Sequence, residues 1–178
     1  MSHSINLLAF AGSTSRSSIN KQLVSYAAGL LSDSVAEVVD LNDYELPLFS
    51  VDVELEIGSP KNAARFFEKI GAADALLISF AEHNGCYAAA FKNLFDWCSR
   101  INPKVYQGKP VVMLATSPGG RGGATVLEIA TKSAPFFGAD LRASLSIPSF
   151  GENFKDGKIV TPDIQRALSD VVNKLRDS

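Results

Sequence analysis

Apolar residues along this chain follow two kinds of pattern, which alternate from one end to the other. Five short runs are mostly apolar and lack helical spacing: Ile5–Ala11, Val35–Leu41, Ala73–Phe80, Pro110–Thr116 and Ala139–Ile147. Short apolar runs bounded by Gly, Pro or Ser are typical of strands buried on both faces. The pattern therefore predicts five buried strands.

Between these runs, apolar residues recur at the spacing of one helix face. Five helices are predicted in this way: one from Ser18 with Ile19, Leu23, Tyr26, Ala27 and Leu30; one with Pro60 in its first turn and Ala63, Phe66, Phe67 and Ile70 inside; one with Ala88, Phe91, Phe95 and Cys98; Ala124–Ala134; and one with Ile164, Leu168, Val171, Val172 and Leu175. The intervening Asn42–Ser59, which contains Pro47 and Gly58, is expected to be irregular.

Strict alternation of strands and helices indicates an α/β fold, in which a parallel sheet is wound right-handedly and covered on both faces. The 178 residues contain no linker, so one domain over residues 1–178 is expected. Three loops at predicted strand ends are unusual: Gly12–Asn20, Ala81–Tyr87 and Ser117–Gly123. In the doubly wound strand order 2-1-3-4-5, their strands are neighbours, and the loops meet in one crevice.

Charge and composition exclude several classes of protein. The 17 Lys and Arg residues against 19 Asp and Glu give a formal charge of −2, whereas a dedicated nucleic-acid binder is usually basic. No apolar stretch approaches the roughly 20 residues that span a bilayer. Residues 1–4 lack the basic opening of a signal peptide, so a cytoplasmic location is expected. Cys86 and Cys98 are expected to be free thiols, and no metal centre is predicted.

The first loop, Gly12–Asn20, places four serines, Thr14 and Arg16 between a strand end and a helix start. Hydroxyl and N–H donors at a helix N-terminus form a cradle for phosphate. Helix capping by Ser17 or Ser18 is the simpler interpretation, but the loop holds more donors than one cap needs. Because the chain lacks the glycine patterns of dinucleotide-binding and P-loop sites, a different phosphate ligand is indicated.

The three loops carry motifs in a fixed order. The pattern G-S-x-R-x-x-S-x-N is matched by Gly12, Ser13, Ser18 and Asn20, while Ser15 takes the arginine column and the arginine follows at Arg16. Residues 81–87, followed by Lys92, Asn93, Asp96 and Trp97, are similar to P-E-Y-N-G-S-Y and K-N-x-x-D-W. With residues 40–52 and the glycine-rich 117–123, these motifs resemble the NADPH-dependent FMN reductase family, which has a flavodoxin-like fold and includes quinone, azo-dye and chromate reductases.

This resemblance implies which residues contact FMN. The phosphate is expected at Ser13, Ser15, Arg16, Ser18 and Asn20. The isoalloxazine edge is expected along Glu82, His83, Asn84 and Gly85, mostly through backbone groups, and its pyrimidine side at Ser117, Gly119 and Gly120. N–H groups there stabilise the negative charge of a reduced ring. A tight turn is the alternative explanation of the glycines, and no catalytic side chain is implied.

The resemblance also implies a function. It indicates an oxidoreductase that passes electrons from NAD(P)H through FMN to a quinone, flavin, azo compound or metal oxyanion. The preference for NADPH is implied only by the name of the family. The alternative is a flavodoxin-type electron carrier without its own NAD(P)H reaction, against which the charge of −2 argues, because such carriers are strongly acidic. A cofactor-free interaction domain on the same fold also stays open.

Some positions depart from the family or suggest assembly. His83 stands where the family has Tyr, and Cys86 where it often has Ser, and they are interpreted as a loop residue and a Ser substitute. The family pairs its subunits around the third predicted helix, so a homodimer or homotetramer is expected. Phe91, Phe95 and Trp97 on that helix are predicted to form part of the interface.

Overall fold

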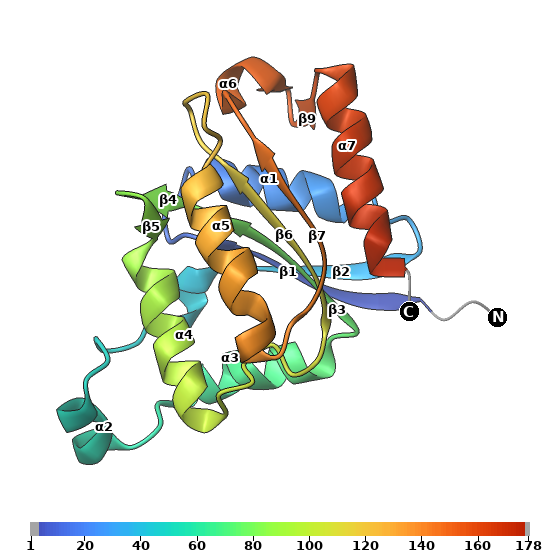
Figure 1. Cartoon of the computed structure of the whole chain (residues 1–178). Coiled ribbons are helices and arrows are strands. Elements are labelled where there is room, and N and C mark those ends of the chain that lie inside the picture. Colours follow the sequence, from blue (N-terminus) through green and yellow to red (C-terminus); the bar gives the residue numbers. More distant parts are fainter. Residues whose placement is uncertain (1–3, 177–178) are drawn as a thin grey trace.

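The computed structural model describes residues 4–176, and at its centre is a parallel sheet of five strands (Figure 1). The strands are β1 (Ile5–Gly12), β2 (Ser34–Val39), β3 (Ala75–Phe80), β6 (Pro110–Thr116) and β7 (Asp140–Ile147). Their spatial order is β2-β1-β3-β6-β7, and each neighbouring pair is parallel. Counted along the chain, these five strands have the predicted order 2-1-3-4-5, so the predicted fold is confirmed.

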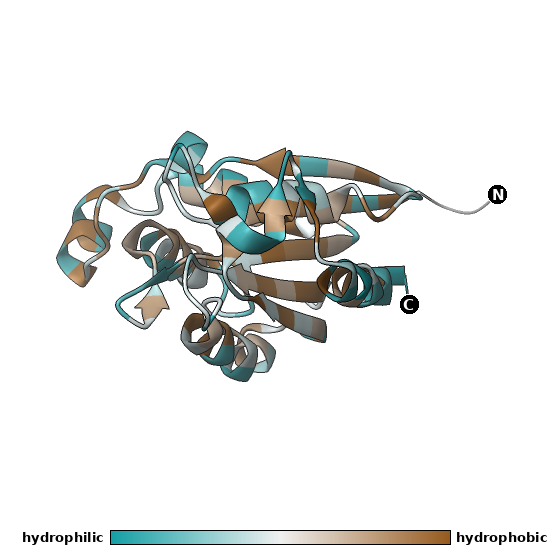
Figure 2. Ribbon diagram, turned by 90° about the horizontal axis from the view of Figure 1, so that it is seen from above, coloured by the Kyte–Doolittle hydropathy of each residue, from teal (hydrophilic) through white to brown (hydrophobic). Residues whose placement is uncertain are grey.

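Helices cover both faces of this sheet and create two hydrophobic cores. One face is covered by α3 (Lys61–Ala72), α4 (Ala89–Ile101) and α5 (Ala124–Ser133), and the other by α1 (Ile19–Ala28) and α7 (Pro162–Asn173). Side chains alternate along a strand, so Ile78 joins the first core and its neighbour Leu77 the second. Figure 2 shows hydrophobic strands between helices with hydrophilic outer surfaces. Burial on both faces explains the continuous apolar runs in the sequence.

Several short elements connect these layers and were not expected from the sequence. They are the hairpins β4 (Glu82–His83) with β5 (Cys86–Tyr87) and β8 (Phe154–Lys155) with β9 (Lys158–Ile159), the 3-10 helices η1 (Leu41–Tyr44), η2 (Ala134–Phe137) and η3 (Lys174–Arg176), and α6 (Phe150–Asn153). Elements this short contain too few positions to show a hydrophobic period. The sequence placed Pro60 in the first turn of α3. In the structure Pro60 is instead the N-cap residue, directly before that turn.

The prediction that Asn42–Ser59 is irregular is wrong in its second half, where α2 (Val51–Ile57) forms. The hydroxyl of Ser50 caps this helix by accepting a hydrogen bond from the amide of Val53 at 3.1 Å. The helix ends at Gly58, whose φ of 70° lies in the region that favours glycine. No residue of α2 is buried. Its apolar residues alternate with acidic ones, so the sequence does not show the helical spacing by which the other helices were predicted.

Residues 47–58, here called the arm, project from the body of the molecule and are anchored to α4 (Figure 1). Trp97 donates its Nε1–H to the carbonyl of Pro47 at 2.8 Å, and its ring meets that of Phe49 edge-on at 5.0 Å. Asn93 accepts a hydrogen bond from the amide of Phe49 at 2.8 Å and donates one to Pro47 at 3.0 Å. Two residues of the K-N-x-x-D-W motif thus fix the path of the arm.

The prediction that the aromatic residues of α4 form part of a subunit interface is wrong for two of the three. Phe91 is only 3% exposed and Trp97 is fully buried, so both belong to the chain's own interior. Phe95 is half-buried and packs against Tyr106 and Phe137. An aromatic stripe at helical spacing shows that a face is buried, but not whether the same chain or another copy covers it.

Cysteine chemistry and membrane insertion were also addressed by the sequence. Cys86 is exposed, Cys98 is buried, and both are free thiols, as expected. Burial raises the pKa of Cys98 to about 12, so its thiol stays protonated and serves as a packing group.

Among residues 4–176, no helix has both the length and the apolar character needed to cross a membrane. Residues 1–3, which entered the expectation about a signal peptide, lie outside the described residues.

Candidate functional site

Three loops that the sequence singled out follow β1, β3 and β6, which are adjacent in the sheet. They meet at the carboxyl edge and enclose a crevice of about 280 Å³, so their predicted convergence is confirmed. Seven predicted site residues line this crevice: Ser13, Ser15, Ser18, Asn20, Glu82, His83 and Ser117. Five others stand on the same loops but outside its lining: Arg16, Asn84, Gly85, Gly119 and Gly120.

The first loop folds back on itself before α1 begins. The hydroxyl of Ser13 accepts a hydrogen bond from the amide of Ser15 at 3.2 Å, and the amide of Ser18 donates to the carbonyl of Ser15 at 3.1 Å. Ser18 caps α1 by accepting from the amide of Lys21 at 3.2 Å, so the capping interpretation is right for this residue. A capping hydroxyl still has its own hydrogen to donate. Capping and anion binding are therefore compatible at Ser18.

Asn20 has a structural role that the sequence did not reveal. Its side-chain oxygen accepts hydrogen bonds from the hydroxyl of Ser79 at 2.7 Å and from the amide of Thr116 at 3.1 Å. Its side-chain nitrogen donates to the carbonyl of Thr116 at 3.1 Å. All three residues are buried, and they come from α1, β3 and β6. Asn20 therefore holds the start of α1 to the ends of β3 and β6, and its contact with phosphate stays a prediction.

The second loop is a two-residue hairpin turn. His83 pairs with Cys86, and the turn residues Asn84 and Gly85 have φ values of 52° and 76°. Positive φ at both central positions defines a type I′ turn, for which Asn-Gly is the preferred sequence. The Asn-Gly pair of the motif is therefore required by the backbone itself. His83 and Cys86 are both exposed on this hairpin.

Glu82 connects this hairpin to the next loop through its side chain. Its carboxylate accepts a hydrogen bond from the amide of Val126 at 3.0 Å, in the first turn of α5. The N-cap of α5 is Gly123, which has no side chain to cap the helix. A carboxylate at a helix N-terminus is favourable both as an acceptor and by its charge. Glu82 thus replaces the missing cap from the neighbouring hairpin, a role separate from the predicted contact with a flavin edge.

The third loop is braced from a segment that the sequence did not implicate. The amide of Ser149 donates to the carbonyl of Gly119, and the amide of Phe150 donates to that of Ser117, both at 3.0 Å. Within the loop, the amide of Gly122 donates to Gly119 at 3.2 Å. Ser149 has a φ of 46°, which is uncommon for a residue other than glycine. The chain that follows β7 therefore supports the glycine-rich loop from behind.

The four glycines of this loop were explained either by a tight turn or by a ligand that lies against the backbone, and the structure shows a different situation for each pair. Gly122 has a φ of 58°, and a Cβ there would lie 2.7 Å from the backbone of Ile147, so packing requires glycine. Gly123 has a φ of 75° and starts α5. A Cβ on Gly119 or Gly120 would meet nothing within 4 Å. The turn therefore accounts for the second pair, while the first pair borders open space, where a ligand could approach the backbone.

Comparisons with known proteins agree on one family. A sequence model of the NADPH-dependent FMN reductase family matches residues 5–148. The chain is 37% identical over 120 residues to an NAD(P)H-dependent FMN reductase of Pseudomonas aeruginosa, covering 67% of this chain and 63% of that protein. It is 34% identical over 125 residues to a quinone reductase of Pseudomonas putida, covering 69% and 66%. The matched segment is thus less than two thirds of each relative's length.

A solved structure agrees with the fold. The chain is similar to FerB, a flavoenzyme NAD(P)H:(acceptor) oxidoreductase of Paracoccus denitrificans, with a TM-score of 0.77 over 97% of this chain and 96% of that one. The two sequences are 23% identical in this alignment. At that identity, the structural similarity supports the fold alone, and membership of the family rests on the sequence matches.

Replacement of Glu82 tests its link to α5. Because Glu82→Ala leaves the amide of Val126 without its acceptor, we expect the free energy of unfolding to fall by about 1–3 kcal/mol. Hydrogen exchange at the Val126 amide should become faster. For Glu82→Gln, both the free energy of unfolding and the exchange rate should lie between those of the unaltered protein and those of Glu82→Ala. The matched control is Glu128→Ala, which removes an exposed carboxylate from the same helix. Equal unfolding and equal exchange in Glu82→Ala and the control would show that the contact contributes nothing.

Proposed function

Because the chain belongs to the NADPH-dependent FMN reductase family, we propose that its crevice binds FMN noncovalently and that the protein passes electrons from a nicotinamide coenzyme to a small acceptor. One observation supports this most directly. At one edge of the sheet, a hydroxyl-rich helix start lines the crevice, and a glycine pair that borders open space directly follows the lining residues Ser117 and Pro118. A phosphate needs the first of these features, and a flat ring close to the backbone needs the second.

The first loop fits the phosphate end of FMN. A phosphate monoester carries roughly −1.5 to −2 charges at neutral pH. The hydroxyls of Ser13, Ser15 and Ser18 line the crevice at the N-terminus of α1, whose first turn contains no acidic residue. The helix dipole therefore favours an anion there, and no carboxylate within that first turn opposes it. Arg16, exposed on the same loop, supplies a cation that can reach the anion.

The third loop fits the flavin ring. Within the described chain, the amides of Gly119 and Gly120 donate to no backbone carbonyl, and no side chain of either residue blocks an approach. Such amides can donate hydrogen bonds to the pyrimidine side of the ring and stabilise negative charge there. Glu82 links the hairpin to α5 and so fixes the two elements relative to each other. When bound, FMN itself supplies the hydride and electron chemistry, so these residues need only bind, orient and tune it.

The acceptor is proposed from the relatives. One of them is named a quinone reductase, and we therefore propose a quinone as the acceptor for this chain. Free flavin, azo compounds and metal oxyanions are the other classes to assay. The flavodoxin-type carrier is the competing function, and it differs in requiring no reaction with a nicotinamide coenzyme.

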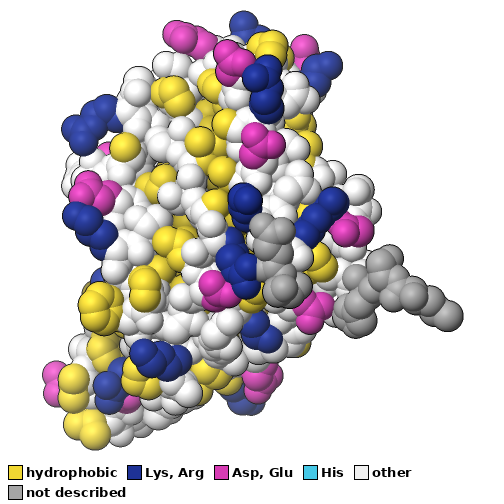
Figure 3. Space-filling model, turned by 45° about the vertical axis from the view of Figure 1, so that its right-hand side comes forward, with side chains coloured by type: hydrophobic (Ala, Val, Ile, Leu, Met, Phe, Trp, Pro, Cys, Tyr) yellow, Lys and Arg dark blue, Asp and Glu magenta, His cyan; other side chains and the backbone are white. Residues whose placement is uncertain are grey.

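We also propose that the chain forms a homodimer or a dimer of dimers, now on the basis of the arm. Leu48, Val51, Leu55 and Ile57 are between 51% and 81% exposed, although all are large and apolar. Figure 3 shows hydrophobic side chains gathered at the lower left, the end of the molecule where α2 lies in Figure 1. Such clustering marks an interaction surface. The arm is anchored to α4, so the proposed interface stays beside the predicted helix.

The phosphate cradle can be tested by comparing FMN with riboflavin, which lacks the phosphate. We expect FMN to bind much more tightly than riboflavin in a fluorescence titration. Arg16→Ala should weaken FMN binding by about 1.5–3 kcal/mol, the range for a hydrogen bond to a charged group. Riboflavin affinity should be unchanged in this variant, which makes it the internal control. An equal effect on both ligands would place Arg16 away from the phosphate.

The reductase is distinguished from the carrier by anaerobic bleaching. In protein saturated with FMN, we expect NADH or NADPH to bleach the flavin absorbance without any protein partner, and a small quinone to restore it. Gly120→Val is a suitable control, because its side chain has room within the protein yet would occupy the proposed ring site. It should fold normally and take up little FMN. Absence of bleaching by either coenzyme in FMN-saturated protein would contradict the reductase and favour the carrier.

Light scattering tests the assembly. We expect twice or four times the chain mass at micromolar concentration for the unaltered protein, and a monomer for Leu55→Asp, since a buried unpaired carboxylate is unfavourable in an apolar interface. Val160→Asp is the control, because it changes an exposed apolar residue that lies outside the arm. A monomeric unaltered protein would contradict the proposed interface.

A further inference from the structure

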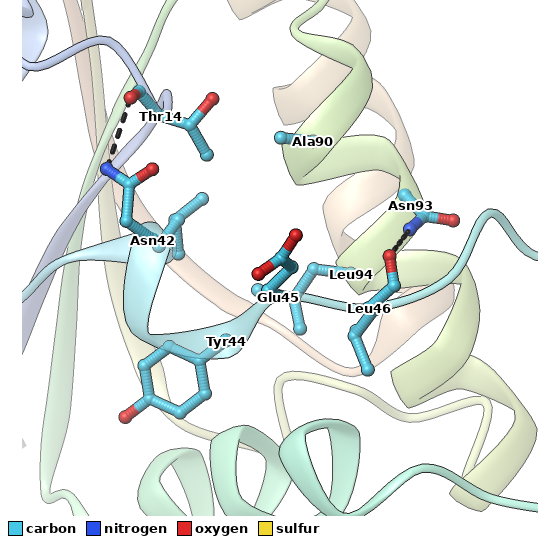
Figure 4. Close-up of a pocket in the computed structure, with 9 residues that line it drawn as sticks. Thr14, Asn42, Tyr44, Glu45, Leu46, Ala90, Asn93 and Leu94 are labelled. Carbon is cyan, nitrogen blue, oxygen red and sulfur yellow. Dashed lines mark hydrogen bonds between the residues drawn. The ribbon is translucent and has the colours of Figure 1, made fainter.

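A second cavity, of about 360 Å³, lies beside the crevice (Figure 4). It is bounded by η1 and the residues that follow it, by α4 and by Thr14. Thr14 stands between Ser13 and Ser15, which line the crevice, so the two hollows share the first loop as a common wall. The volume is within the range of small-molecule sites, about 300–1,000 Å³. None of the residues that the resemblance assigns to FMN lines this cavity.

The cavity has an apolar floor and a polar rim. Leu41 and Leu94 are buried beneath it, and Ala90 is half-buried. In Figure 4 the carboxylate of Glu45 points into the open centre, opposite Thr14. Within residues 4–176 this carboxylate forms no ion pair. A ligand with an apolar part over this floor and hydrogen-bond donors for the free carboxylate would match both features.

The rim beside Thr14 is already held in place. Asn42 donates to the carbonyl of Thr14 at 3.1 Å and to Asp40 at 2.8 Å. Lys21 donates a hydrogen bond to Asp40 and lowers the pKa of that carboxyl, which keeps Asp40 ionised. This pair joins α1 to the start of η1. The wall is therefore fixed before any ligand arrives, which lowers the ordering cost of binding.

Two cations on elements beside the cavity are engaged elsewhere, and Arg16 on the first loop lies outside the lining. Lys21 is paired with Asp40. Arg65 lies over the ring of Tyr44, 5.0 Å from its centroid, and donates to Asn62 at 2.8 Å. None of the residues that line the cavity is Lys, Arg or His. An added phosphate would therefore meet the charge of Glu45 with no lining cation to balance it.

We propose that this cavity receives the adenosine end of the nicotinamide coenzyme, with Glu45 accepting hydrogen bonds from the ribose hydroxyls and the apolar floor lying under the adenine. The assignment rests on the proposed function, which brings the nicotinamide end to the crevice. A carboxylate recognises a free ribose diol, whereas a 2′-phosphate needs a cation in that place. The chain therefore prefers NADH to NADPH, although its family is named for NADPH.

Direct binding tests the cavity without any reaction. Protein saturated with FMN is titrated with AMP, or with adenosine 2′,5′-bisphosphate, while amide signals are followed by NMR. We expect AMP to shift the signals of Thr14, Ala90 and Leu94, and the 2′-phosphorylated nucleotide to bind at least tenfold more weakly. Glu45→Gln should weaken AMP binding about tenfold, as for the loss of a charged hydrogen-bond partner. Asp43→Asn is the control, since this exposed carboxylate lies on η1, two residues before Glu45, and does not line the cavity.

Coenzyme preference supplies a second, independent readout. Anaerobic flavin reduction is measured with NADH, NADPH and reduced nicotinamide mononucleotide, which lacks adenosine. We expect at least a tenfold preference for NADH, lost in Glu45→Gln through a higher KM and reversed in Glu45→Lys. Reduction by the mononucleotide should be the same in all three proteins.

The outcomes separate the two proposals. If no donor reduces the flavin, the proposed reductase function fails, and the AMP titration alone decides the cavity. If reduction occurs but AMP and the 2′-phosphorylated nucleotide bind equally, or if the Glu45 variants keep the original coenzyme ratio, the assignment of this cavity is overturned and the reductase function stands.

Discussion

The carboxamide of Asn20 satisfies polar groups that would otherwise be buried without partners where two strands of the sheet end. It bonds the hydroxyl of Ser79 on β3 and both backbone groups of Thr116 on β6, from its own place at the start of α1. Unpaired polar groups at this depth would cost about 1–3 kcal/mol each. No apolar residue could provide both a donor and two acceptor contacts in one plane. The arrangement of the crevice depends on these hydrogen bonds of Asn20, because they keep the first and third loops at a fixed separation.

Besides these hydrogen bonds of Asn20, contacts between residues that are remote in the sequence hold the hairpin and the glycine-rich loop in place. Glu82 reaches from the hairpin to the amide of Val126, and Ser149 and Phe150 support the carbonyls of the glycine-rich loop. The backbone that borders the crevice is therefore held in place, while Gly119 and Gly120 keep open space beside them. A preorganised site of this kind loses little entropy when a ligand binds. The same fixed frame extends to the neighbouring cavity through Asn42 and Asp40.

The sequence predicted those parts of the molecule whose cause is local or periodic. β6 was located to the residue, because Pro110–Thr116 is apolar up to its last residue and lies between two glycine-containing stretches. The strand order followed from the resemblance to a flavodoxin-like family, and the meeting of the loops followed from that order. By contrast, α2 buries nothing, and its apolar residues alternate with acidic ones at the period of a strand instead of a helix. Its Ser50 cap and terminal Gly58 were visible as signals, but they had no amphipathic stretch between them to support a helix.

Long-range contacts set the other limit on prediction. Glu82 and Asn20 were chosen as ligand contacts by motif, yet their side chains bond Val126 and Thr116, which are 44 and 96 residues away. A motif marks that a residue type is needed without showing whether a ligand or the protein itself needs it. The Asn-Gly pair illustrates this, since its type I′ turn explains both residues without any cofactor.

The central claim, that the crevice is an FMN site, is tested most directly by the visible absorption spectrum of the purified protein. The account predicts the two absorption bands of oxidised flavin, and the release of one equivalent of intact FMN per chain on denaturation. A folded protein that is colourless, and remains so after incubation with excess FMN and removal of the unbound flavin, would contradict it.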